Sequence, residues 1–409
     1  MTPDSIEIDS PEMQLLLSCV SGRQDATQQQ QALRCLKLRP DAGLVSWLAG
    51  RHRMIPQVYE TLPSSATKVR ARLKSLNAQC TLNNLVMQSE VARIARAFRD
   101  AGVPLLVMKG AAVEQQVYPQ GQHRQYRDID LLVKPKDLEA ACQVLRRLSY
   151  SGQVCDIEQA NAAQRKRLIK YSKHVGATRV IGRSSVVVEL HWRPGGTPRM
   201  FESFMQSDFH NVDNVKIGGE HVCTFPFPES LIYLACHGGR HRWKRLSWLC
   251  DFVRAVEKLE ACDWGTMFSI ADRLKLRPYL NLAFSLVQSL MPWYELPLGA
   301  DSQLYSNSGM TRVVETCRHA IEADELHYEN RPLSGPRWYF ELPHCFSDRI
   351  HALQSIIAPE QDDILKRSWW GANVRRVTHV VRRLTTRRHT SPEGENESVA
   401  ATLPARKAA

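Results

Sequence analysis

Apolar residues recur at helical spacing through the first hundred positions of the chain. Apolar clusters at 12–20, 33–48 and 54–62 predict short helices, with breaks at Pro40 and Pro56. The pair Ser10-Pro11 suits the N-cap and first position of the first helix. A longer helix is expected over 64–100, ending at Gly102. Its apolar stripe consists of Leu73, Leu76, Leu82, Leu85, Val86, Ile94 and Phe98.

The pattern then changes to short apolar runs, which are typical of buried strands. Such runs occupy 104–108, 129–133 and 185–192. A Lys109-Gly110 turn and a short helix ending at Tyr118 follow the first run. A helix over 136–148 and a Ser151-Gly152 turn follow the second, and a further helix is expected over 158–171 within the basic stretch 155–180. This order of strands and helices predicts an α/β or α+β catalytic core.

Beyond residue 200 the pattern becomes helical again. A hairpin at 212–225 is expected to turn at Gly218-Gly219, followed by helices at 228–236, around Leu246 to Val256, from Asp263 and over 279–290. Two more are expected within 301–358. The basic segment 366–389 predicts an amphipathic helix, and 390–409 is poor in apolar residues and expected to be disordered. We predict four regions: an N-terminal helical region (1–79), a core (80–200), a C-terminal helical domain (201–389) and a tail (390–409).

Composition narrows the class of protein and its partners. A chain of 409 residues with 43% hydrophobic and 23% charged residues is ordinary for a soluble globular protein. An acidic N-terminus and the lack of an apolar run of about 18 residues predict neither export nor a membrane span. Eleven cysteines without a CxxC pair indicate reduced thiols and a cytoplasmic location. The net charge of +12 points to an acidic partner, such as a nucleotide, a nucleic acid or an anionic membrane surface.

Three carboxylates are the candidate chemistry of the core. Asp128 and Asp130 stand two apart in an extended segment, so they point to the same side. Glu189 lies near the end of the third predicted strand, with His191 on the same face. Hard oxygen ligands of this kind hold Mg²⁺ for phosphoryl or nucleotidyl transfer. The alternative is that Asp128 caps its loop and pairs with Arg124 or Arg127.

Each of the other candidate motifs has both a functional and a structural interpretation. The Lys109-Gly110 turn before a helix favours phosphate, although packing turns have the same pattern. His237 and His241, beside Cys236, have a spacing that suits Zn²⁺ but also a structural or phosphate-contacting role. The cluster of Arg240, Arg242, Lys244 and Arg245 suits either an anionic ligand or a solvated helix face. No GxSxG, HExxH or Walker motif is present, which disfavours hydrolases, metalloproteases and P-loop proteins.

The sequence resembles a known group of enzymes. The run KG, YP and RDIDLLV, then VELHW and a CH…WKRLSWLCDF segment, is similar to the uncharacterised nucleotidyltransferase group of the DNA polymerase β-like superfamily, which includes bacterial proteins. The resemblance covers about 86–384. It implies an α+β polymerase β-like core, with Asp128, Asp130 and Glu189 as the catalytic metal-binding carboxylates. Lys109 and Gly110 become the phosphate turn.

Further nucleotide contacts are expected from residues near the carboxylates and the phosphate turn. We predict that Arg124 and Arg127 also bind nucleotide, and that His237 and Arg245 contact the acceptor or phosphate. The superfamily usually places Gly-Ser or Gly-Gly in the phosphate turn, whereas this chain has Ala111 after Gly110 and so lacks the hydroxyl. Lys109 is expected to substitute for it.

These features predict a nucleotidyltransferase that uses Mg²⁺ or Mn²⁺. It moves a nucleoside monophosphate from an NTP to an acceptor, which is a small molecule, a saccharide, a peptide or RNA, and releases pyrophosphate. One alternative is a toxin-type enzyme that modifies tRNA or protein. The other is a non-catalytic protein on the same fold that binds RNA or a protein partner through the basic segment 366–389.

Overall fold

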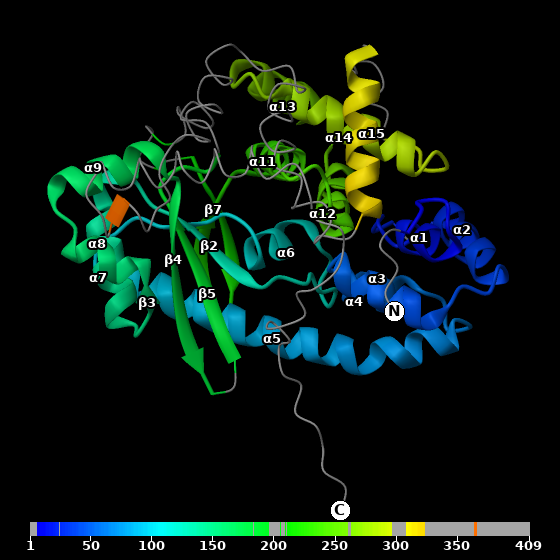
Figure 1. Ribbon diagram of the computed structural model, residues 1–409, viewed down its shortest axis with the longest axis horizontal. Helices are drawn as coiled ribbons and strands as arrows, with labels where there is room; N and C mark the ends of the chain where they lie inside the picture. The colour runs from blue at the N-terminus through cyan, green and yellow to red at the C-terminus, as the bar shows by residue number, and fades with distance from the viewer. Residues whose placement is uncertain are drawn as a thin grey trace, which may run out of the picture.

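A five-stranded mixed sheet lies at one end of the protein and a group of helices at the other (Figure 1). The structure, a computed structural model, describes residues 6–23, 25–182, 184–195, 205, 209, 211–260, 263–296, 308–323 and 364–365. It is a mixed α+β fold, as expected. The second helix predicted within 301–358, the basic segment 366–389 and the tail 390–409 lie outside the described residues.

Four short helices begin the chain: α1 (Pro11–Leu17), α2 (Ala26–Lys37), α3 (Ala42–Arg51) and α4 (Ile55–Thr61). Their starts follow from local chemistry, because the side chains of Ser10, Asp25 and Asp41 each accept a hydrogen bond from a backbone N–H in the first turn. The cap at Ser10 confirms the prediction. Pro56 does not break a helix; it lies in the first turn of α4, where proline is tolerated.

The long helix α5 (Thr67–Asp100) runs beneath both ends of the molecule (Figure 1). It ends at Asp100, two residues before Gly102, whose φ of +67° is a left-handed conformation that glycine adopts without strain. Three members of the predicted stripe are wrong, because Leu76, Leu82 and Leu85 are 37%, 64% and 56% exposed. Most of the buried positions from Val69 to Phe98 are three, four or seven residues apart, so they share one face of α5, and Leu82 and Leu85 lie off that face. The first part of this face packs in a cluster with helices and the second part in a cluster with the sheet.

The sheet has the strand order β1-β2-β5-β4-β3. The neighbours β2 and β5 are parallel, and the other three pairs are antiparallel. The strands are β1 (Leu106–Val107), β2 (Asp128–Leu132), β3 (Ser151–Gly152), β4 (His174–Ile181) and β5 (Ser184–His191). Two of these correct the sequence analysis, because 174–181 form a strand that was missed, and Ser151-Gly152 pairs with β4 instead of only turning the chain.

Helices and a hairpin surround the sheet. The connecting elements are α6 (Ala111–Val117), the 3-10 turn η1 (Pro135–Asp137), α7 (Leu138–Arg147), α8 (Gln153–Gln159) and α9 (Ala162–Tyr171). The single helix predicted over 158–171 is therefore two, α8 and α9. The predicted hairpin is confirmed as β6 (Asp213–Ile217) and β7 (Glu220–Thr224), with Gly218 and Gly219 between them.

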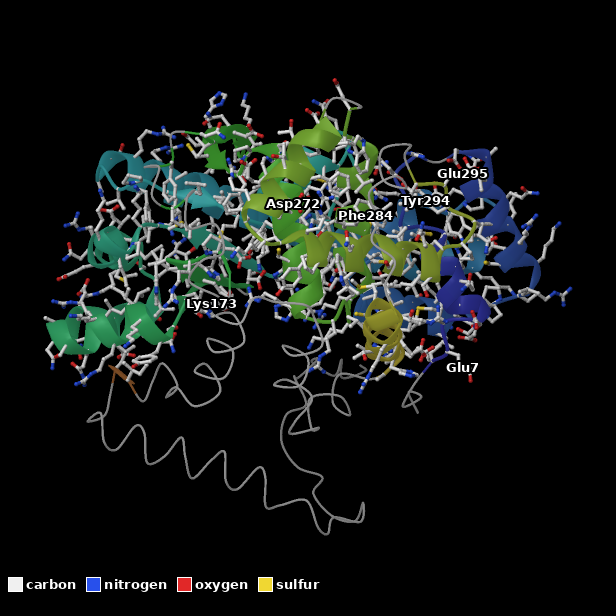
Figure 2. The ribbon with its side chains drawn as sticks, turned by 90° about the horizontal axis from the view of Figure 1, so that it is seen from above. Glu7, Lys173, Asp272, Phe284, Tyr294 and Glu295 are labelled. Carbon is white, nitrogen blue, oxygen red and sulfur yellow. The ribbon has the colours of Figure 1, made fainter. Side chains whose placement is uncertain are left out.

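The C-terminal helices are α11 (Phe227–Arg240), α12 (Leu246–Glu257), α13 (Asp263–Arg273), α14 (Arg277–Leu290) and α15 (Ser308–Glu322). They share one hydrophobic cluster with α1–α4 and the first part of α5, whereas a second cluster joins the rest of α5 to the sheet. In the view from above, Phe284 lies among the C-terminal helices, with Lys173 toward the sheet and Glu7 at the opposite end (Figure 2). The division at 79/80 and 200/201 stays a prediction.

Candidate active site

The parallel pair β2 and β5 brings the three predicted carboxylates to one face of the sheet. In register, Asp130 lies opposite Glu189 and Asp128 lies opposite Val187. Cross-strand partners point to the same face, and residues two apart along a strand do so as well. Ile129 and Leu131 alternate with the carboxylates and are buried in the core beneath the sheet. The alternation of polar and apolar residues in β2 thus fixes which face carries Asp128 and Asp130.

A chain of polar contacts joins these strands at Asp130. Lys109 Nζ lies 2.9 Å from Asp130 Oδ1, and His191 Nε2 lies 3.2 Å from the same oxygen. His191 Nε2 also lies 3.1 Å from Glu189 Oε2, so the imidazole links two of the three carboxylates. Asp130 is 1% exposed and His191 is 3% exposed. The other carboxylate oxygen, Asp130 Oδ2, is buried without a hydrogen-bond partner among the described residues.

Burial and neighbouring charges act differently on the two aspartates. Burial alone would raise the pKa of Asp130, but the Lys109 charge and the His191 contact outweigh it and hold the pKa well below its usual range. Burial, followed by the charge of Asp130, raises the pKa of Asp128. For Glu189 the hydrogen bond from His191 is the largest cause and lowers the pKa. Asp130 and Glu189 therefore stay ionised at neutral pH.

Strand β4 adds one residue that the sequence analysis did not select. His174 lies opposite His191 in register, with 4.8 Å between the ring centroids. His174, Glu189 and His191 offer ligand atoms within 4.8 Å of one another, the one such group found among the described residues. Burial lowers the pKa of His174 to about 3, so its imidazole is neutral and able to bind a metal. His237, His241 and Cys236, which the sequence suggested as zinc ligands, do not form such a group among the described residues.

Several cations surround the carboxylates at the Asp130 end. Burial opposes the charge of Lys109, but Asp130 outweighs it and raises the pKa, so Lys109 remains an ammonium ion. Lys173, which precedes β4, has a pKa lowered to about 7 by burial and then by the charges of Arg240 and Lys109. Both lysines also act electrostatically on the half-buried His237 of α11. A group that carries several negative charges would be stabilised here.

The other predicted C-terminal contact lies elsewhere. Arg245 donates to the carbonyl oxygen of Arg51, and its charge lowers the pKa of Arg53, for which burial is the largest cause. The charge of Asp128 acts in the opposite direction and favours the charged form of Arg53. Arg245 and Asp128 thus act electrostatically on the same group, Arg53.

The phosphate turn depends on Gly110. Its φ is +62°, and a Cβ at this position would lie 3.4 Å from the Tyr126 ring. A side chain here would be both strained and crowded. Ala111 is 2% exposed at the start of α6, which is only seven residues long. Any phosphate contact at this turn therefore depends mainly on Lys109 and the backbone.

The two arginines of the basic loop have different environments. Arg124 is buried and donates through Nε to both carboxylate oxygens of Asp251, at 2.8 and 2.9 Å, while its Nη2 lies 2.8 Å from Oδ2. The sequence-based alternative of an Asp128–Arg124 pair is therefore wrong. Arg127 is exposed and lines a cavity beside Asp128. Only Arg127 has its guanidinium in a place that a ligand can reach.

A model of the uncharacterised nucleotidyltransferase family matches residues 39–292, more than half of the chain. The matched region contains all three carboxylates, the Lys109-Gly110 turn and α11. The comparisons with curated proteins and with solved structures gave no match. In the part of the chain that the structure describes, no helix has both the length and the apolar character needed to cross a membrane.

Proposed function

Because the chain belongs to the uncharacterised nucleotidyltransferase family, we propose that it transfers a nucleoside monophosphate from an NTP to an acceptor, with release of pyrophosphate. The observation that carries the proposal is the placement of Asp128, Asp130 and Glu189 on one face of the paired strands β2 and β5. Lys109 approaches the same group of carboxylates from the phosphate turn. Three carboxylates beside a fixed ammonium ion suit a triphosphate that is bound together with a divalent cation.

The donor atoms fit a divalent metal ion. Asp130 Oδ2 is buried without a hydrogen-bond partner among the residues that the structure describes, and Glu189 is the register partner of Asp130 on the neighbouring strand β5. Asp128, Asp130 and Glu189 would hold Mg²⁺ or Mn²⁺, with His174 and His191 as nitrogen ligands in reach of Glu189. When bound, the ion would neutralise charge that develops on the phosphoryl oxygens. The nitrogen ligands favour an ion softer than Mg²⁺.

Each remaining residue has a defined part in the proposal. Lys109 and Lys173 bind the negative charge of the triphosphate, with Arg240 near them. Gly110 lets the backbone come close to the phosphates. His191 orients Asp130 and Glu189 through its contacts at 3.2 and 3.1 Å. Arg124 is left out of the site because Asp251 occupies its guanidinium.

The reaction forms one bond and breaks one bond. The acceptor oxygen bonds to the α-phosphorus of the NTP, and the bond from that phosphorus to the bridging oxygen breaks. Pyrophosphate leaves with the electron pair of that bond, and the proton of the acceptor group passes to water. Attacking and leaving oxygens lie roughly in line in such transfers.

The direct test is transfer of label from each α-labelled NTP, with Mg²⁺ or Mn²⁺, to candidate acceptors. Asp130→Asn is expected to lower the rate at least about 100-fold, as loss of an electrostatic catalytic group commonly does. Asp100→Asn, at the exposed end of α5, is the matched control and should keep full activity. Equal label transfer by wild type and Asp130→Asn would exclude the proposed site.

A second candidate is a non-catalytic protein that retains the fold. The observation in its favour is that Lys109 and His191 already contact Asp130 Oδ1, while Ala111 lacks the hydroxyl usual in this turn. Such a protein would bind NTP without releasing pyrophosphate under any metal condition. Pyrophosphate release measured beside NTP binding separates the two candidates.

A further inference from the structure

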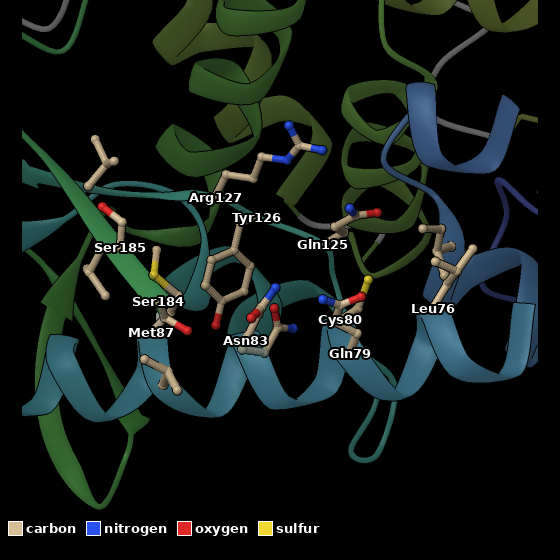
Figure 3. Close-up of a pocket in the computed structure, with 15 residues that line it drawn as sticks. Leu76, Gln79, Cys80, Asn83, Met87, Gln125, Tyr126, Arg127, Ser184 and Ser185 are labelled. Carbon is tan, nitrogen blue, oxygen red and sulfur yellow. The ribbon is translucent and has the colours of Figure 1, made fainter. Parts of the chain in front are cut away.

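A cavity of about 680 Å³ lies beside the Asp128 end of the carboxylates. Helix α5 forms its floor, the start of β5 forms one wall, and Tyr126 and Arg127 line it from the segment before β2 (Figure 3). Its volume falls within the range of about 300–1,000 Å³ that is usual for small-molecule pockets.

Two residues that line the cavity are direct neighbours of Asp128. Val187 lines the cavity and is the register partner of Asp128 on the neighbouring strand. Arg127 lines it as well and directly precedes Asp128 in the chain. Since cross-strand neighbours have Cβ atoms about 5 Å apart, a ligand in the cavity lies next to the Asp128 carboxylate.

The position of the cavity relative to the cations indicates whether it binds the NTP or the acceptor. Lys109 Nζ lies 2.9 Å from Asp130 Oδ1. Lys173 directly precedes His174, the register partner of the His191 that contacts the same oxygen. The triphosphate is thus expected at the Asp130 end. In an in-line transfer the acceptor approaches the α-phosphorus from the side opposite the leaving pyrophosphate. The cavity, at the Asp128 end, is on that side.

The lining also indicates the chemistry of the acceptor. Amide side chains of Gln79 and Asn83, one turn apart on α5, and the hydroxyls of Ser184 and Ser185 face it. Leu76 and other aliphatic side chains complete the wall. The described residues of the lining include no carboxylate, so a polycationic acceptor finds no counter-charge among them. Arg127 is the single cation among these same residues, which is too few for a polyanion such as RNA.

We propose that this cavity is the acceptor site and that it takes a small, neutral molecule with several hydroxyl groups, of the chemical class of a saccharide. Amides and hydroxyls both donate and accept hydrogen bonds, which matches a ring of hydroxyl groups. The aliphatic wall packs against the apolar faces of the sugar ring. The inference rests on the proposed function and adds to it the class of acceptor and the place where it binds.

The experiment uses the full chain and two matched variants. Val187→Trp fills the cavity, and because Val187 is 37% exposed a larger side chain does not disturb the core. Val180→Trp makes the same change at a position that is 73% exposed and outside the lining. Binding of α-labelled NTP in the presence of Mn²⁺ is measured for each protein, to report separately on the nucleotide site.

The acceptor probe is a protein-free small-molecule extract of bacterial cells, divided by ion exchange at pH 7 into neutral, cationic and anionic fractions. We expect label to enter products of the neutral fraction, with a rate at least tenfold lower for Val187→Trp than for Val180→Trp and unchanged NTP binding in both. Transfer only to a charged fraction, equal rates for the two variants, or NTP binding without transfer to any fraction would overturn the acceptor proposal. Absence of metal-dependent NTP binding in the wild type would instead show that the proposed function fails, and the acceptor site with it.

Discussion

The ammonium group of Lys109 lies 2.9 Å from Oδ1 of Asp130, and both side chains are largely shielded from water. Removing one partner of a buried ion pair leaves the other charge uncompensated, which commonly costs about 3–5 kcal/mol of stability. Because His191 still contacts Asp130, we expect Lys109→Met to lower the free energy of unfolding by about 3 kcal/mol, the lower end of that range. Urea denaturation followed by circular dichroism, with EDTA present, measures this change.

A double variant provides the control for that prediction. Lys109→Met combined with Asp130→Asn removes both charges, so it should recover much of the stability that Lys109→Met loses. If the double variant is no more stable than Lys109→Met alone, the loss comes from packing of the lysine side chain and not from the unpaired carboxylate.

Nitrogen ligands beside Glu189 predict the metal preference of the site. Imidazole binds first-row transition ions better than it binds Mg²⁺. We therefore expect Co²⁺, which reports its ligands through visible absorption, to bind with a dissociation constant at least about tenfold below that of Mg²⁺. His174→Ala should remove that advantage and change the spectrum, whereas His241→Ala should leave both unaltered. An unchanged Co²⁺ spectrum in His174→Ala would exclude this histidine as a ligand.

The lowered pKa of Lys173 predicts a pH dependence of stability. Burial and the nearby cations lower its pKa from 10.5 to about 7 in the folded protein. Between pH 7 and 10.5 the unfolded chain thus binds a proton that the folded chain lacks, so this group makes stability rise with pH, by at most about 1.4 kcal/mol per pH unit. Below pH 7 its contribution is constant and unfavourable.

Lys173→Met is expected to remove that rise and to stabilise the protein at pH 7 and below. Urea denaturation at several pH values between 6 and 10, without metal, provides the measurement. The exposed Lys74→Met is the control and should keep the wild-type pH profile. Parallel profiles for wild type and Lys173→Met would show that Lys173 does not titrate in this range.

Arg124 is expected to support the fold and not the nucleotide. Its guanidinium contacts the fully buried Asp251, and Tyr118 also donates to Asp251, with 2.8 Å between the oxygens. Arg124→Met should lower the free energy of unfolding by about 3–5 kcal/mol, because it leaves that carboxylate without its cation. NTP affinity of the folded protein should stay within about twofold. A large loss of NTP affinity at full stability would restore Arg124 to the nucleotide site.

The positions of Asp128, Asp130 and Glu189 could be predicted from the sequence because they depend on patterns within short segments. The period of two along 128–130 places Asp128 and Asp130 on one face, and the apolar run around Glu189 marks a strand of the same core. The family match supports the nucleotidyltransferase assignment that the KG and DID motifs suggested. The metal, the acceptor and the roles of individual residues stay predictions.

What the sequence analysis missed depends on pairing between distant segments. The stretch 174–181 alternates only weakly, with Val175 and Ala177 buried between polar neighbours, so its mixed composition hid a strand. Ile181 pairs with Ser184, and that short connection sets the register that brings His174 opposite His191. A tight turn between β-branched residues was the available signal. Arg124 and Asp251 are 127 positions apart, and no local pattern indicates their contact.

The shared cluster of the first and last helices has a consequence for how the protein is made. The backbone N–H groups of Ile6 and Ile8 both bond to Glu322, the last residue of α15. On the ribosome, α1–α4 emerge more than 160 residues before the C-terminal helices that share their hydrophobic cluster. The apolar surface that α1–α4 share with these helices therefore stays exposed to water, or is bound by a chaperone, until α11–α15 are synthesised. Slowing translation between α9 and α11 is therefore expected to increase aggregation of the nascent chain, although it alters no residue of the active site.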